Sequence, residues 1–216
     1  MGKGISKVMS ILEKEFGSLR QPTVRRTSKT RDPFKVLITC LLSLRTQDKN
    51  TGIASRRLFE HASTPKEIVK MPVKKLEKLI FSSGHYRKKA RVLKHVSGEL
   101  IKRFDSKVPN TKDELLSIKG IGPKTANIVL AFAYGKLVIP VDTNVHRISN
   151  RLGLVKTKRP EDTEKELMKI IPKRYWKELN TTFILHGKTI CKPISPICSI
   201  CPVKDLCPKI GVTKSR

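Results

Sequence analysis

Glycine and proline divide most of this 216-residue chain into short segments with helical periodicity. A series of short helical segments is typical of an all-helical fold. Residues 90–104 carry apolar side chains at spacings of three and four, which predicts an amphipathic helix with a basic outer face. Residues 34–42 are apolar on almost every side, as expected for a buried helix. Only residues 137–141 resemble a strand, and that stretch is short. We therefore predict an all-α fold.

Two segments carry the residue pattern of a helix start. Thr64 and Thr111 are each followed three residues later by a glutamate, Glu67 and Glu114. In such a capping box the two side chains bond reciprocally to amide groups that the helix leaves unpaired. In the first box Pro65 also occupies the favoured first helical position. Both segments are predicted to open helices.

The charge balance indicates the class of partner. The chain has 46 Lys and Arg against 18 Asp and Glu, a formal net charge of +28. A surplus of this size usually meets a polyanion, so nucleic acid is the favoured partner. A generally cationic, ribosomal-type protein is the alternative. No apolar run reaches the roughly 20 residues that span a bilayer, so we expect no membrane association.

Residues 111–126 form the first candidate site. A capped helix is followed by the turn Gly120-Ile121-Gly122, and Pro123 opens the next helix. Glycine allows consecutive amide groups to point at one anion, and the helix that follows adds its positive end. We interpret this segment as a helix-hairpin-helix that binds DNA phosphate, the alternative being a plain turn between helices. The candidate DNA contacts are Lys119, Gly120, Ile121, Gly122 and Thr125.

Two residues near the hairpin have more than one interpretation. Lys124 lies in the first turn of the helix after the hairpin, and Asp142 follows eighteen residues later in the chain, at the start of another helical segment. Taken alone, Lys124 could contact phosphate and Asp142 could be an N-cap. Downstream, His146, Arg147 and Arg151 are interpreted as solvent-facing or as DNA contacts, and His186 as a structural residue.

Four of the five cysteines lie within the last 26 residues, as Cys191, Cys198, Cys201 and Cys207. Crowding of this kind favours a metal site over disulfides in an intracellular protein. The ligands suit a [4Fe–4S] cluster or a tetrahedral zinc. Zinc ribbons usually present two tight Cys-x2-Cys pairs and this chain has one, which favours the cluster. Cys40, within the apolar helix, is interpreted as a buried hydrophobic residue.

The hairpin, the Lys124–Asp142 pair and the cysteine spacing of six, two and five together resemble the endonuclease III family, over nearly the whole chain. The resemblance implies that Lys124 is a nucleophile that forms a Schiff base and that Asp142 is its electrostatic and acid–base partner. It implies a [4Fe–4S] cluster on the four cysteines. Related monofunctional glycosylases carry Tyr or Ser at the position of Lys124.

The resemblance also implies two helical domains with a DNA-binding groove between them. Residues 26–136 would form a central helical barrel with the hairpin at about 111–126. Residues 1–25 and 137–216 would form a second, discontinuous domain that ends in the cluster loop 191–207. The chain departs from the family where Arg45 replaces a Gln that fills the gap left by the flipped base, with Gln47 close by. Arg45 and Gln47 are therefore candidate DNA contacts.

Three functions are consistent with the sequence. The leading one is a bifunctional DNA glycosylase/AP lyase that removes oxidised or ring-saturated pyrimidines from duplex DNA. The alternatives are a glycosylase for uracil or thymine opposite guanine and a non-catalytic hairpin protein that only binds DNA. The expected partner is double-stranded DNA with a damaged base or abasic site. The protein is expected to be monomeric, cytoplasmic and nucleoid-associated, in a prokaryotic or archaeal cell.

Overall fold

The structure, a computed structural model, describes residues 2–216, and every regular element among them is a helix. The chain divides into two compact units: unit 1 comprises Met1–Gln21 and Leu137–Arg216, and unit 2 comprises Pro22–Lys136. Met1, which opens the expected discontinuous domain, lies outside the described residues. The all-α prediction is confirmed, and residues 137–141 form no strand.

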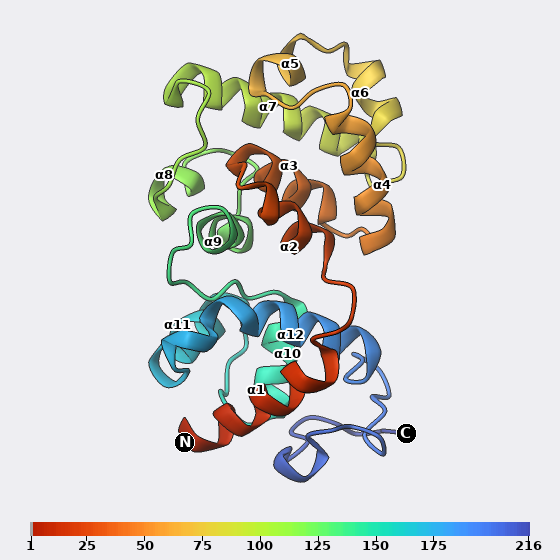
Figure 1. Cartoon of the computed structure of the whole chain (residues 1–216), viewed down its shortest axis with the longest axis vertical. Coiled ribbons are helices and arrows are strands. Elements are labelled where there is room, and N and C mark those ends of the chain that lie inside the picture. Colours follow the sequence, from red (N-terminus) through yellow and green to blue (C-terminus); the bar gives the residue numbers. More distant parts are fainter. Residues whose placement is uncertain (1) are drawn as a thin grey trace. The chain divides into compact units, whose positions relative to one another are not determined.

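Unit 2 is built around two buried helices, α3 and α9, which pack against each other (Figure 1). The side chains of α3 from Val36 to Leu42 are almost completely buried, which confirms the expected central helix. Helix α3 contacts α2, α4, α7 and α9. The elements are α2 (Thr23–Thr27), η1 (Ser28–Thr30), α3 (Pro33–Ser43), α4 (Asp48–Phe59), α5 (Pro65–Lys70), α6 (Val73–Leu79), α7 (Tyr86–Phe104), α8 (Lys112–Leu116) and α9 (Pro123–Phe132).

The two capping boxes differ in the structure. At the start of α5 the box is complete, since the Thr64 hydroxyl accepts from the Glu67 N–H and the Glu67 carboxylate accepts from the Thr64 N–H. At the start of α8 the Thr111 hydroxyl accepts from the Glu114 N–H. The Glu114 carboxylate, however, bonds the Thr111 hydroxyl instead of a backbone amide. The second box is therefore only half formed, although both helices begin where predicted.

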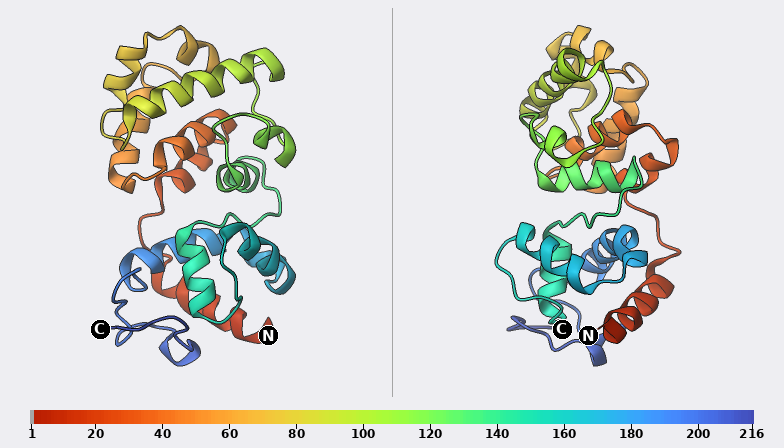
Figure 2. Two further views of the ribbon diagram at one scale, coloured as in Figure 1. Left: turned by 180° about the vertical axis from the view of Figure 1, so that it is seen from behind. Right: turned by 90° about the vertical axis from the view of Figure 1, so that its left-hand side faces the viewer.

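Unit 1 joins the first helix of the chain to the last ones. Figure 2 shows α1 beside the blue α12, and the two helices pack against each other. Met9 and Leu12 of α1 are buried in the same apolar cluster as Phe183 of α12. The elements are α1 (Gly2–Phe16), α10 (Thr143–Arg151), α11 (Pro160–Ile170), η2 (Lys173–Tyr175), α12 (Trp176–Thr189) and η3 (Lys204–Leu206). Among the described residues, no helix has both the length and the apolar character needed to cross a membrane.

Candidate functional site

The hairpin between α8 and α9 is held against α7. Gly120 has a φ of 106°, in the region that side chains disfavour, and a Cβ atom there would lie 3.1 Å from Val92 Cγ1. Ile121 is buried beside it and donates its N–H to the Ile118 carbonyl. Gly122 is the N-cap of α9 and faces open space. The first-turn amides of α9 have no partner within the helix and are available to an anion.

The two glycines of the hairpin should respond differently to alanine. Gly120→Ala is expected to destabilise the fold by about 1–2 kcal/mol, because the added Cβ is strained by its positive φ and crowds Val92. Gly122→Ala should leave stability almost unchanged, since nothing lies within 4 Å of its Cβ. Thermal unfolding measures the first effect, and duplex binding measures whether the Gly122 methyl group hinders DNA. Equal melting temperatures for the two variants would contradict the structural role of Gly120.

Lys124 is the second residue of α9, and its side chain is half-buried. Within the described residues its ammonium makes no hydrogen bond or ion pair. Its charge acts on the Cys40 thiol in α3, where it opposes the burial that raises the pKa of Cys40. The neighbouring Thr125 hydroxyl lies 3.8 Å from the Cys40 Sγ. Cys40 is fully buried, as predicted. Lys124 is therefore positioned by α9 but not engaged by another side chain.

Asp142 is the N-cap of α10, in unit 1. Its Oδ1 accepts the backbone N–H groups of Asn144 and Val145 at 2.8 and 2.9 Å. Its Oδ2 accepts from the Asn144 side-chain amide at 3.1 Å. The N-cap interpretation is thus confirmed, and the cap leaves the carboxylate only half-buried. An additional chemical role requires Asp142 to act beyond its own helix.

Arg45 and Gln47 are exposed on the short loop between α3 and α4. Arg45 has a φ of 49°, a left-handed conformation that is unusual for a residue with a side chain. Gln47 is the N-cap residue of α4, but its side chain makes no capping bond. Both side chains are therefore available for contacts outside the protein. In the hairpin, the side chains of Ile121 and Thr125 are buried, and the Ile121 N–H bonds the Ile118 carbonyl, so of these two residues only Thr125 can offer a backbone amide to a phosphate.

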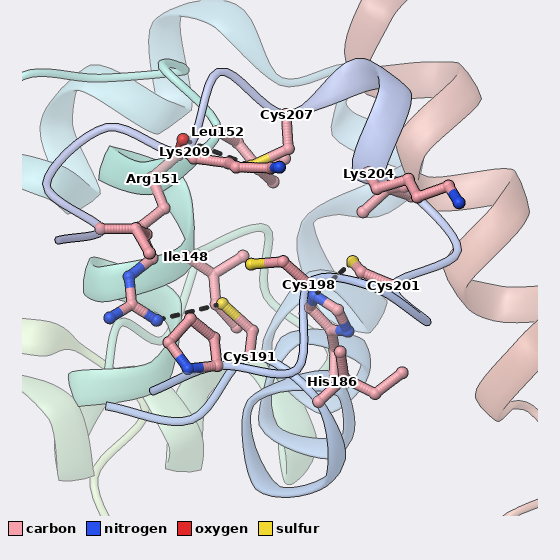
Figure 3. Close-up of a pocket in the computed structure, with 14 residues that line it drawn as sticks. Ile148, Arg151, Leu152, His186, Cys191, Cys198, Cys201, Lys204, Cys207 and Lys209 are labelled. Carbon is pink, nitrogen blue, oxygen red and sulfur yellow. Dashed lines mark hydrogen bonds between the residues drawn. The ribbon is translucent and has the colours of Figure 1, made fainter. Parts of the chain in front are cut away.

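The four C-terminal cysteines surround one cavity, shown in Figure 3. Burial raises the pKa of Cys201 and of Cys207, and the neighbouring cysteine thiolates raise each further. Four thiolates gathered without a cation would be unfavourable, so this donor set suits a metal centre. Within residues 2–216, however, no three Cys, His, Asp or Glu side chains converge enough to hold a single ion. Ligands of one tetrahedral zinc would lie about 4 Å apart, given Zn–S bonds of about 2.3 Å.

Side chains of α10 and α12 complete the walls of the cysteine cavity. Arg151 is only 9% exposed and donates to the Cys191 Sγ at 3.4 Å, and to the Lys192 and Pro193 carbonyls at 2.7 and 2.8 Å. Arg147 donates to the Cys191 carbonyl at 2.8 Å. The expectation that Arg151 faces solvent or DNA is wrong, because its guanidinium is buried and donates its hydrogen bonds to the cysteine loop.

His186 of α12 is also part of this wall (Figure 3). It is 2% exposed, and its Nε2 lies 3.9 Å from the Cys201 Sγ. Burial, with Arg147 nearby, lowers the pKa of His186 to about 4. The sequence could not reveal this location, because His186 and Arg151 reach the loop only through the packing of α10 on α12.

Comparisons with known proteins show which family the chain resembles. Residues 38–173 match the HhH-GPD superfamily of base excision DNA repair proteins. Endonuclease III of Thermotoga maritima is 46% identical over 182 residues, which are 84% of this chain and 85% of that protein. Endonuclease III of Rickettsia felis is 35% identical, over 89% of this chain and 91% of that protein. A solved structure of a trapped covalent intermediate between endonuclease III and DNA is 36% identical, with a TM-score of 0.86 over 97% of this chain and 96% of that one.

The helical fold and the superfamily match define a base excision DNA repair protein with a helix-hairpin-helix. Within that superfamily, the chain belongs to the endonuclease III family. It is a DNA glycosylase/AP lyase, and its partner is DNA.

Proposed function

We propose that this enzyme removes oxidised or ring-saturated pyrimidines, such as thymine glycol, from duplex DNA and then cleaves the strand. The observation that carries the proposal is the location of Lys124, in the first turn of the helix that follows the hairpin, where its amine makes no hydrogen bond or ion pair within the described residues. A phosphate held at the start of α9 would bring a sugar close to this amine. Lys124 therefore has the side chain and the location that an amine nucleophile needs.

The chemistry follows from the amine. Neutral Lys124 Nζ attacks the sugar C1′ as the bond to the damaged base breaks, and the base departs after it gains a proton. The sugar ring opens to give a Schiff base between Nζ and C1′. Loss of a C2′ proton then expels the 3′ phosphate by β-elimination, and water hydrolyses the Schiff base to release the enzyme. Water could hydrolyse the glycosidic bond but could not form the Schiff base, so strand cleavage requires the amine.

Asp142 is proposed to stabilise positive charge that develops on the sugar and to assist proton transfer. Its capping bonds fix the carboxylate in one orientation at the start of α10. The catalytic role would need a carboxylate at position 142, whereas Asn or Ser would cap the helix equally well.

Asp142→Asn separates these two roles, because Asn and Asp rank together as N-caps. We expect the melting temperature to stay close to that of the wild type. The single-turnover rate of base removal should fall about 100-fold, since positioned acid–base groups contribute roughly 10²–10⁴-fold. Thermal unfolding and single-turnover assays on thymine glycol measure the two effects. A variant with the native rate would restrict Asp142 to its capping role.

The proposed DNA contacts divide between main-chain and side-chain groups. The backbone of Gly120, Gly122 and Thr125 would bind phosphate through N–H groups, and exposed Lys119 would add charge. Ile121 would shape the turn, because its own N–H bonds the Ile118 carbonyl. Arg45 and Gln47 would meet the DNA near the lesion. An arginine at this position could fill the gap left by a flipped base or bind phosphate. The two compact units are proposed to act as the two domains of the family, with the protein monomeric and nucleoid-associated in the cytoplasm.

The four cysteines are proposed to hold a [4Fe–4S] cluster. Thiolates are the ligands that such clusters use, and the spread of the four donors around a cavity suits several irons better than one zinc. When bound, the cluster would supply structural cross-linking of the loop 191–207. The ligands would be Cys191, Cys198, Cys201 and Cys207, with Arg151 and Arg147 bonding the same loop.

Borohydride trapping tests the proposed function. The protein is incubated with duplexes that contain thymine glycol, uracil opposite guanine, or an abasic site, because borohydride reduces a Schiff base to a stable covalent complex. Trapping on thymine glycol is the expected result. Trapping on the uracil duplex alone would favour the mismatch glycosylase, and trapping on abasic DNA alone would overturn the proposed base substrate. No trapping on any duplex would leave only a hairpin protein that binds DNA.

A further inference from the structure

Lys89, in the first turn of α7, is a buried ammonium with three neutral acceptors. Lys89 is only 8% exposed. Its Nζ donates to the Leu42 carbonyl at 2.7 Å, the Thr46 hydroxyl at 2.7 Å and the Ser83 hydroxyl at 2.8 Å. Lysine is almost never buried unless it is paired. No carboxylate pairs with Lys89 in the described part of the chain. All three N–H donors of this ammonium are therefore used within the protein.

The three acceptors come from separate segments of unit 2. Leu42 lies in the last turn of α3, Thr46 lies in the loop before α4, and Ser83 lies in the loop before α7. The Gly84 N–H also donates to the Thr46 hydroxyl at 3.0 Å. A Cβ atom on Gly84 would lie 2.8 Å from the Arg45 carbonyl, so the two loops are in direct contact. The Thr46 hydroxyl therefore accepts hydrogen bonds from both Lys89 and Gly84.

The segment held in this way presents the two candidate DNA contacts of the loop. Arg45 and Gln47 flank Thr46 in the sequence, and both are exposed. Arg45 has a left-handed backbone conformation, which a free loop would avoid by relaxing. Bonds to Thr46 oppose that relaxation. Burial lowers the pKa of Lys89 to about 8, so the side chain is still mainly the three-donor ammonium at neutral pH.

We propose that Lys89 is a positioning residue, which fixes the loop 44–47 through the Thr46 hydroxyl and thereby sets where Arg45 meets DNA. The proposal rests on the proposed DNA-binding role of Arg45. Lys89 itself touches no DNA in this scheme, because all its donors bond the protein. A buried apolar residue could fill the same space but could not connect three segments that each offer an oxygen.

Thr46→Val is the sharpest test, because valine keeps the branched shape and loses only the hydroxyl. We expect the Kd for a duplex with an abasic-site analogue to rise about tenfold, as a hydrogen bond to a charged group contributes substantially to stability. Thr46→Ser keeps the hydroxyl and should restore most of the affinity. Thr27→Val is the matched control, since the Thr27 hydroxyl bonds only within α2. Fluorescence anisotropy measures all four proteins, with melting temperatures recorded beside them.

A double-mutant cycle shows whether the effect passes through Arg45. If it does, Thr46→Val should cost affinity in the wild type and almost nothing in the Arg45→Ala background. An equal loss in both backgrounds would overturn the proposal, as would native affinity in Thr46→Val. Lys89→Met should reproduce the Thr46→Val effect, with an added loss of stability from its unpaired acceptors. Binding is measured without turnover, so absence of Schiff-base trapping would refute the proposed function and leave this test intact.

Discussion

Lys124→Gln is expected to abolish borohydride trapping and to reduce strand cleavage at abasic sites by about 10⁴-fold or more, the scale seen when a catalytic nucleophile is removed. Glutamine has a similar length and keeps a polar end, but its amide cannot form a Schiff base. Lys124 has no partner among the described side chains, so its loss leaves no buried group unsatisfied. The melting temperature should therefore change little.

DNA binding distinguishes the nucleophile from a phosphate contact. If Lys124 only neutralised phosphate, Lys124→Gln would weaken binding and trapping in parallel, and saturating protein would restore cleavage. A nucleophile gives the opposite result, with Kd changed by less than about tenfold and cleavage still about 10⁴-fold slower at saturating protein. Lys102→Gln, on the exposed part of α7, is the matched control for loss of one charge. Cleavage by Lys124→Gln at the native rate would show that the nucleophile is another residue.

Cys198→Ser is expected to remove the proposed metal centre and to disorder the C-terminal loop. Past α12 this loop has only the short helix η3 as regular structure, and the exposed Ile194, Ile200 and Ile210 add little to its packing. Val203 is buried in the apolar cluster of unit 1 and Ile197 and Leu206 pack against it, and the proposed cluster would add links between the four cysteines to this packing. Losing a few kcal/mol would lower the melting temperature by about 10 °C, at roughly 2–4 °C per kcal/mol for a chain of this size.

Metal analysis gives a readout that is independent of activity. The wild type should contain iron and acid-labile sulfide in equal amounts, about four of each per chain if the cluster is complete. Cys198→Ser should contain much less of both, while Cys40→Ala should match the wild type because Cys40 is buried in α3 of unit 2. About one zinc per chain, with no iron, would contradict the proposed cluster. Full DNA affinity in a folded, metal-free variant would contradict a structural role in DNA binding.

Features that depend on near neighbours in the chain could be predicted from the amino-acid sequence. The Thr64–Glu67 box and the helical periodicity of α7 depend on residues a few positions apart, so a short window of sequence contains their cause. Gly120 is different, because its close approach to Val92 of α7 also requires a glycine there. The half-formed box at Thr111 shows the limit even of such local patterns, because Glu114 bonded the hydroxyl instead of the amide.

Which distant side chains serve the same site depends on the packing of the helices and could not be predicted. Arg151 became a support for the cysteine loop through bonds to residues about 40 positions away, and Lys89 joined segments up to 47 positions apart. Neither role follows from residue type, since a lysine or arginine in a chain of net charge +28 is expected on the surface. Burial decides such roles, and burial depends on how the helices pack. The candidate catalytic residues could therefore be predicted from motifs in the sequence. The supporting residues Arg151 and Lys89 could not, because their roles depend on how the helices pack.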